Sequence, residues 1–152
     1  MTDRAILFAA AYLRALATGL MGVFLGIYLD KLAFSAAEIG MVIGAGLTGG
    51  AASALLVTLL GDRLGRRRAL LALTLASAAG GFALLFTTSL LAVCAVAFLG
   101  MVNGMGRDRG AALVLEQAIL PATVTPEQRT RVFAWYNVLQ DIGHAFGGLL
   151  AI

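Results

Sequence analysis

Charged side chains are scarce in this sequence. Aspartate, glutamate, lysine and arginine make up 12% of its 152 residues, whereas hydrophobic residues make up 61%. A soluble domain carries about 25% charged and about 45–50% apolar residues. The composition therefore excludes an ordinary soluble domain and indicates a chain that resides in a lipid bilayer.

Residues that usually carry catalysis or bind metals are also few. The sequence has one histidine, His144, and one cysteine, Cys94, which cannot form an internal disulfide. No Cys/His metal spacing, nucleophile elbow or glycine-rich phosphate loop occurs. We expect no catalytic residues, no metal and no cofactor, so the chain is not expected to be an enzyme. Its net charge of +3 sits at segment ends rather than on one face, so no nucleic-acid partner is expected.

Proline is rare too, and both prolines, Pro121 and Pro126, fall in one polar stretch. The remaining apolar segments are long enough for helices that cross a membrane, which need about 20 residues each. The first has about 25 residues and exceeds the roughly 7–15-residue apolar core of a signal peptide, so we expect a retained helix. The sequence predicts an all-α, polytopic membrane helix bundle, a single membrane domain over residues 1–152. Its five spans are expected at residues 5–29, 37–60, 69–88, 90–120 and 132–152.

The fourth segment allows two interpretations, because Arg107, Asp108 and Arg109 interrupt its apolar run. Either the helix stops at Gly106 and the rest lies on the membrane surface, or it continues to Leu120 with charges in a protein-lined space. No helix-breaking proline occurs before Pro121, so we favour the continuous helix.

A cationic hinge, Gly61–Arg68, separates the second and third segments. Its arginines cannot lie in hydrocarbon and must reach water or lipid headgroups. With alternating spans, one side of the membrane receives the basic residues Arg4, Arg63, Arg66, Arg67, Arg68, Arg129 and Arg131, and the other receives only Lys31. Because basic loops stay in the cytoplasm, we expect a multi-pass protein of the cell (inner) membrane with a cytoplasmic N-terminus.

Ionisable side chains inside a membrane cost roughly 2.5–3.5 kcal/mol each on insertion scales and usually mark a functional pathway. The candidate substrate or proton pathway comprises Arg14, Arg107, Asp108, Arg109, Glu116, Asp141 and His144. Arg14 either attracts an anionic part of a substrate, pairs with an acid on another helix, or extends to the headgroups. Arg109 and Glu116 are seven residues apart and share a helix face, either as part of a salt-bridge lattice or in contact with substrate.

Polar residues also form a stripe on the last segment, where Asp141 and His144 are three residues apart. A buried carboxylate beside an imidazole suits a proton relay, because desolvation raises a carboxyl pKa and the imidazole can accept the proton. The alternative is a hydrogen-bonded stripe that packs against another helix.

The hinge resembles the loop signature of the major facilitator superfamily of secondary transporters. The matching residues are Asp62, Arg63, Gly65, Arg66 and Arg67, and the location between the second and third spans also agrees. The glycine that the signature places four residues before the aspartate is Thr58 here. The resemblance implies that these five residues form a cytoplasmic gate. It also implies a fold of twelve helices in two halves, with the substrate site between them.

This chain offers only five of those helices. We therefore expect an incomplete major-facilitator transporter of an unknown small molecule, either an N-terminal fragment or a truncated member. Expected partners are the lipid bilayer, the substrate, a proton as candidate coupling ion, and the missing C-terminal helices or another copy of the chain. The alternative is a small membrane protein without transport activity, or a decayed gene product.

Overall fold

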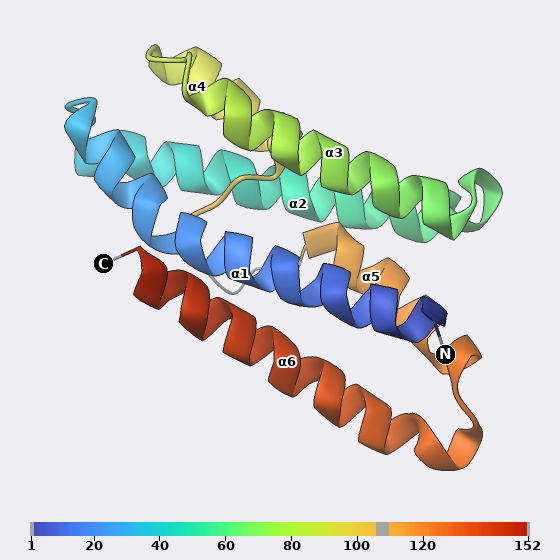
Figure 1. The fold of residues 1–152 in the computed structure, drawn as a ribbon. Helices are drawn as coiled ribbons and strands as arrows, with labels where there is room; N and C mark the ends of the chain where they lie inside the picture. Colours follow the sequence, from blue (N-terminus) through green and yellow to red (C-terminus); the bar gives the residue numbers. More distant parts are fainter. Residues whose placement is uncertain (1, 106–109, 152) are drawn as a thin grey trace.

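A computed structural model describes residues 2–105 and 110–151, which form helices and short connections without any strand in those two ranges. The elements are α1 (Thr2–Lys31), α2 (Ala36–Leu64), α3 (Arg66–Leu84), α4 (Leu90–Gly100), α5 (Gly110–Ile119), the 3-10 turns η1 (Leu120–Thr123) and η2 (Pro126–Gln128), and α6 (Arg129–Leu150). Figure 1 shows the long helices running side by side in one bundle. The predicted all-α helix bundle is confirmed.

The bundle has two distinct ends. One end holds the N-terminus, the α2–α3 turn and the α5–α6 connection, and the other holds the α1–α2 and α3–α4 connections and the C-terminus (Figure 1). Arg4, Arg63, Arg66, Arg67, Arg68, Arg129 and Arg131 lie in the first or last turns of helices at the first end. Lys31 ends α1 at the opposite end. The arginines are therefore gathered at one end, as the alternation of spans predicts.

Two helices of the described chain are long and apolar enough to cross a membrane by length and composition: residues 4–31 of α1, and α2. α4 and the α5–η1 segment are shorter apolar pieces. Large apolar side chains point outward over the bundle, among them Phe86, Leu91 and Leu99, each more than 70% exposed. Such an outer surface is suited to lipid contact rather than to water.

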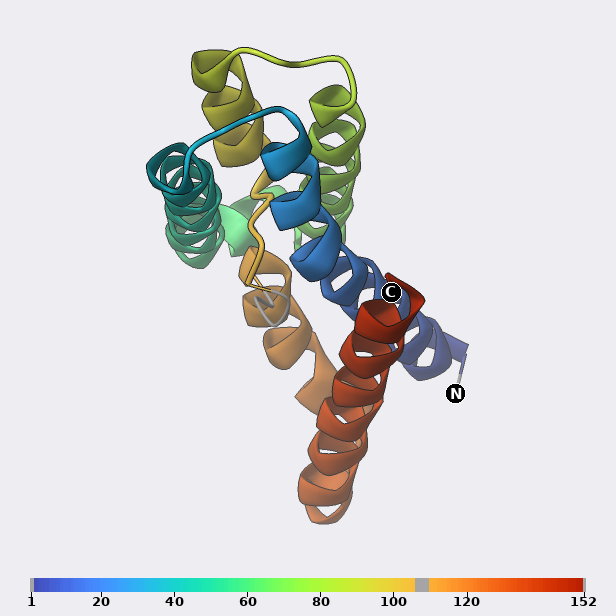
Figure 2. The ribbon, with the colours of Figure 1, turned by 90° about the vertical axis from the view of Figure 1, so that its left-hand side faces the viewer.

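The favoured continuous helix over 90–120 is wrong. α4 ends at Gly100, Met101 adopts a left-handed conformation with φ of 55°, and α5 begins only at Gly110. Figure 2 shows the non-helical stretch that directly follows α4, at residues 101–105. Arg107, Asp108 and Arg109 lie outside the described residues.

Close packing explains a break at this place without proline. A side chain added at Gly100 would lie 2.7 Å from the Cα of Gly80 on α3, so α3 and α4 touch backbone to backbone there. Just beyond, the backbone of Val102 lies against Gly46 of α2, where an added Cβ would fall 1.9 Å from the Val102 carbonyl oxygen. These tertiary contacts hold the chain in a path that a straight helix could not follow.

α1 and α6 also pack closely. Cβ atoms added at Gly143 and Gly147 of α6 would collide with the backbone of Tyr12 and Leu16 on α1. Small residues at four-residue spacing permit such an approach in lipid, where no hydrophobic force draws helices together. This contact sets the rotation of α6 relative to α1, and so decides which of its side chains face the bundle.

The α5–α6 connection lies at the arginine-rich end. Glu127 in η2 is fully exposed, and hydrogen bonds from its own backbone and from the Thr125 hydroxyl hold the pKa of its carboxyl below the usual value. This carboxylate therefore remains charged and solvated in the turn.

Candidate functional site

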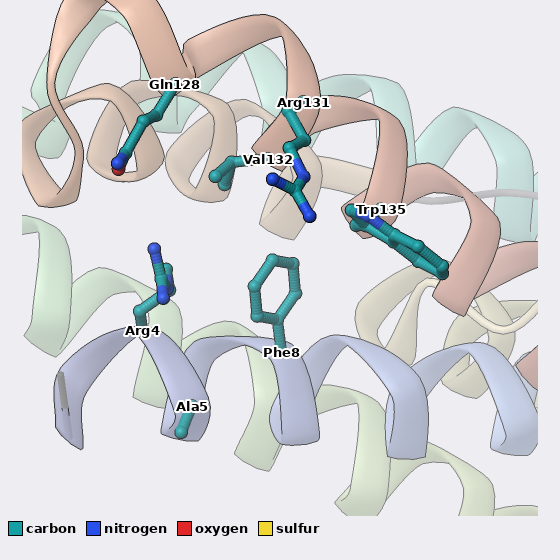
Figure 3. A pocket seen from close by; sticks show the side chains of 7 residues that line it. All are labelled: Arg4, Ala5, Phe8, Gln128, Arg131, Val132 and Trp135. Atoms are coloured by element: carbon teal, nitrogen blue, oxygen red, sulfur yellow. The ribbon is translucent and has the colours of Figure 1, made fainter.

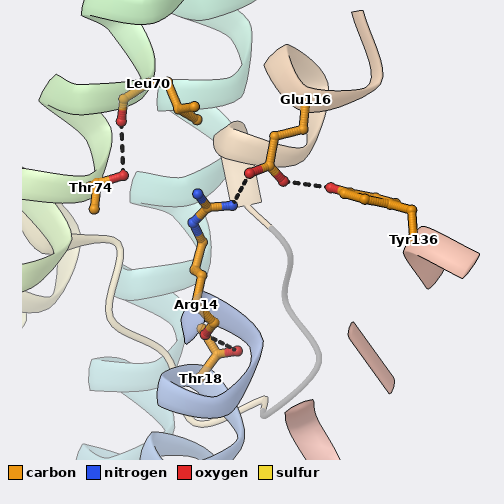
Figure 4. A network of polar contacts seen from close by, with 6 residues as sticks. All are labelled: Arg14, Thr18, Leu70, Thr74, Glu116 and Tyr136. Atoms are coloured by element: carbon orange, nitrogen blue, oxygen red, sulfur yellow. Dashed lines mark hydrogen bonds and ion pairs between the residues drawn. The ribbon is translucent and has the colours of Figure 1, made fainter. Parts of the chain in front are cut away.

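A buried carboxylate joins three helices. Arg14 Nη1 on α1 donates to Glu116 Oε1 on α5 at 2.6 Å, and the Tyr136 hydroxyl on α6 donates to Glu116 Oε2 at 2.5 Å (Figure 4). The Glu116 side chain is 1% exposed and that of Arg14 is 24% exposed. Both oxygens of the carboxylate thus have a donor, one of them a cation, so the charge of Glu116 is compensated locally.

The helix packing places these groups. Tyr136, Gln140 and His144 follow one another at four-residue spacing on α6 and are all buried. The glycine contacts between α1 and α6 turn this stripe toward α1. Phe8 packs against the Tyr136 ring, with their centroids 6.1 Å apart, which orients the hydroxyl.

A second polar contact lies farther along the same two helices. The Thr18 hydroxyl on α1 lies 3.1 Å from His144 Nδ1 on α6 and also bonds to the carbonyl of Arg14. Gln140 lies between this pair and Tyr136 on the stripe, and its Nε2 has no hydrogen-bond partner in the described part of the chain. The α1–α6 interface is therefore polar from Tyr136 to His144.

This arrangement can respond to a change of charge. If a proton neutralised Glu116, or if an anion drew Arg14 away, the bond between α1 and α5 would weaken. A buried charge left alone is strongly unfavourable. The helices would then have to rearrange to compensate the remaining group.

The chain reverses direction within the cationic hinge at a single glycine, Gly65. Gly65 has φ of 85°, a conformation that residues with a side chain rarely adopt, and it separates α2 from α3. Across it, Arg66 Nε donates to Asp62 Oδ1 at 2.9 Å, while Arg66 Nη1 donates to the Ala118 carbonyl at 2.9 Å. Ala118 lies in the last turn of α5, where carbonyl oxygens lack helical partners and the helix dipole is negative. Arg66 thus caps α5 and ties it to the hinge.

α5 consequently connects the two sites. Glu116 holds Arg14 in the interior, and two residues further on the carbonyl of Ala118 holds Arg66 at the bundle end. A shift of α5 that breaks the Glu116–Arg14 contact would therefore also displace the Ala118 carbonyl from Arg66.

The structure brings some predicted site residues together and separates others. Arg14 pairs with an acid on another helix, one of the interpretations offered from the sequence, and that acid is Glu116. Asp141 is exposed while His144 is buried, so the described chain does not bury the carboxylate of the suggested relay, and the relay stays a prediction. Arg63 and Arg67 of the hinge are exposed, and the three consecutive charged residues 107–109 lie outside the described ranges.

Sequence reasoning missed the role of Tyr136. The residue belonged to the polar stripe, but the partner of its hydroxyl lies on α5, 20 residues away in the chain. The available signal was its spacing: Tyr136 stands four and eight residues before Gln140 and His144, on the face that packs against α1.

The fold and the site together define a polytopic helical membrane protein with a buried ion pair in its interior and a basic turn at one end. The chain belongs to the Major Facilitator Superfamily, whose family model matches residues 7–152. The resemblance noted in the hinge is thereby confirmed, and the membrane location with it. Members of this family are transporters rather than enzymes, which agrees with the expectation from the sequence.

The uncharacterized membrane protein YJR124C of Saccharomyces cerevisiae is a relative with 23% identity over 148 residues. The match covers 97% of this chain and 33% of the yeast protein, so the chain spans about a third of the length of that relative. No solved structure matches the chain.

Proposed function

We propose that this chain is the N-terminal portion of a secondary transporter that moves a small molecule across the cell membrane. Family membership supports the transport class. The coverage of the yeast relative supports incompleteness, since two thirds of that protein have no counterpart here. The remaining helices, or a second copy of the chain, would supply the other wall of the substrate pathway.

The observation that carries the proposal is the buried Arg14–Glu116 pair with Tyr136 as its third member. A buried ion pair adds little net stability compared with apolar packing of the same volume. In a membrane protein such groups mark substrate or ion pathways by default. A proton on Glu116 or an anionic substrate group at Arg14 would open the pair and release α5 from α1.

The hinge completes this mechanism. Opening of the pair would let α5 move, and the Ala118 carbonyl would leave Arg66. The Asp62–Arg66 pair would then hold only the α2–α3 turn. The hinge would in this way act as a gate that responds to opening of the Arg14–Glu116 pair. The gate residues are Asp62, Arg63, Gly65, Arg66 and Arg67.

The arginine-rich end is proposed to face the cytoplasm. With Cys94 replaced by alanine, a cysteine at Arg67 should be protected from a membrane-impermeant maleimide in intact cells and react after permeabilisation. A cysteine at Asp30, at the opposite end, should react in intact cells. The reverse pattern would contradict the proposed orientation.

The experiment that tests transport begins with the size of the native product in membranes, detected by an antibody to its N-terminal region. The complete protein is then reconstituted in vesicles and assayed for uptake of a panel of small molecules with and without a proton gradient. A product of this length without flux, alone or as an oligomer, would instead support a non-transporting membrane protein.

Three variants make the flux measurement specific. Arg14→Gln and Glu116→Gln should abolish transport, because each removes one side of the pair. Glu127→Gln, which neutralises an exposed loop carboxylate, should transport normally. Full transport by both interior variants would contradict the assigned role of the pair.

A further inference from the structure

A crevice of about 520 Å³ opens between the first turns of α1 and α6. In Figure 3 side chains from the two helices point toward each other across it. Arg4 and Phe8 come from α1, Arg131 and Trp135 from α6, and Gln128 from the turn before α6. The crevice lies at the arginine-rich end of the bundle, and its Phe8 packs against Tyr136 on the inner side.

The lining of the crevice, as far as the structure describes it, carries two arginines and no acid. Neither Arg4 nor Arg131 forms an ion pair in the described part of the chain. Two guanidinium groups directed into one space repel each other unless an anion lies between them. Guanidinium matches phosphate and carboxylate oxygens through pairs of parallel hydrogen bonds, and the Gln128 amide adds a further donor.

The rest of the lining is apolar or aromatic. Phe8 and Val132 form the inner wall, and Trp135 stands at the edge with 61% of its surface exposed. Tryptophan prefers the boundary between headgroups and hydrocarbon, because its ring is apolar and its N–H is polar. A free phosphate ion would use the arginines but leave this apolar wall and Trp135 without a partner.

We propose that the crevice binds the headgroup of an anionic phospholipid, with its phosphate between Arg4 and Arg131 and the start of an acyl chain along Trp135. The lipid would bridge the first turns of α1 and α6, the two helices that meet where Phe8 packs against Tyr136. The crevice shares no lining residue with the Arg14–Glu116–Tyr136 site, and its test measures lipid contact rather than transport.

Trp135 reports on the site directly, because it is the single tryptophan of the sequence. The full 152-residue chain is reconstituted in phosphatidylcholine vesicles that contain a minor fraction of brominated lipid, which quenches indole fluorescence on contact. The brominated lipid is either phosphatidylglycerol or phosphatidylcholine. Quenching of Trp135 should favour phosphatidylglycerol by roughly fivefold for each arginine that contacts the headgroup.

The matched variants test whether the crevice or the general surface charge is responsible. Arg4→Gln with Arg131→Gln should remove the preference, whereas Arg67→Gln with Arg68→Gln, which removes the same charge from the exposed start of α3 at the same end, should keep it. Arg4→Lys with Arg131→Lys should retain part of it, and this pair serves if the neutral variant fails to fold.

Three results would overturn the proposal. Equal quenching of the wild type by the two brominated lipids would show that the crevice does not select an anionic headgroup. Equal losses in both arginine pairs would show only general surface attraction. Reversal of the quenching by inorganic phosphate would show that the site takes the free anion rather than the lipid.

Discussion

Arg14 on α1 and Glu116 on α5, 102 residues apart in the chain, meet through a hydrogen-bonded ion pair of 2.6 Å. The pair is asymmetric, because the carboxylate is 1% exposed whereas the arginine side chain is 24% exposed. Loss of the arginine and loss of the carboxylate should therefore lower the free energy of unfolding by different amounts, and this difference can be measured.

Removing the arginine should cost more than removing the acid. Arg14→Gln leaves a fully buried carboxylate with only the Tyr136 hydroxyl, and loss of one partner of a buried pair costs roughly 3–5 kcal/mol. Glu116→Gln leaves an arginine that still reaches solvent or headgroups, so its cost should be smaller. The measurement is equilibrium unfolding in detergent by circular dichroism.

The double variant Arg14→Gln with Glu116→Gln is the control for the pair. Its loss of unfolding free energy should be smaller than the sum of the losses in the two single variants, because neither charge then remains without its partner. Additive losses would mean that the two side chains are not coupled.

Tyr136→Phe should destabilise the chain by about 1–3 kcal/mol, the usual cost of leaving one buried acceptor unsatisfied. The ring and its packing against Phe8 are kept, so the loss reports the hydroxyl alone. Tyr12→Phe is the matched control, since no hydrogen bond of the Tyr12 hydroxyl is found in the described part of the chain. Equal thermal melting of the Tyr136 variant and wild type would contradict the bond to Glu116.

Gly147→Ala should separate α1 from α6. The added Cβ would lie 2.1 Å from the Leu16 carbonyl oxygen, a backbone atom that cannot move aside alone, whereas at neighbouring Gly148 nothing lies within 4 Å. Overpacking of this kind costs typically about 1–3 kcal/mol or more. The melting temperature should fall for Gly147→Ala and stay or rise slightly for Gly148→Ala; similar values for both would show that the helices are less closely packed.

Arg66→Lys should loosen the end of α5. The guanidinium of Arg66 reaches Asp62 through Nε and the Ala118 carbonyl through Nη1, and a single ammonium group cannot match that fork. Hydrogen exchange of the amides from residues 115 to 123 should become faster. Arg67→Lys, at an exposed position of the same turn, should leave the exchange unchanged, and faster exchange in both variants would mean that total charge matters rather than the contact.

Much of the architecture followed from composition and local pattern. The predicted starts of the second and fourth segments lie within a residue of α2 and α4, because Ser35 caps α2 with Glu38 as its partner and Ser89 precedes α4. The hinge was recognised from its four arginines between two apolar segments and from its signature residues. The structure adds that Gly65 adopts a φ of 85°, which glycine tolerates readily. The gathering of arginines at one end followed from counting alternating spans.

The wrong prediction of a continuous fourth helix arose where contacts distant in sequence decided the outcome. The helix break after Gly100 depends on Gly80 and Gly46, which belong to other helices. The exposure of Asp141 and the burial of His144 depend on how α6 rotates against α1. No local pattern contains that information, because a polar stripe can equally face a cavity or a neighbouring helix.

The sequence alone determined that this protein is a helical membrane bundle with a basic turn, because apolar length and charge position are properties of each segment by itself. Only the tertiary structure decided which acid neutralises Arg14, and that Arg66 caps α5. Both contacts join residues that are far apart in the chain, on α1 and α5 and on α3 and α5, so they exist only once the helices have packed together.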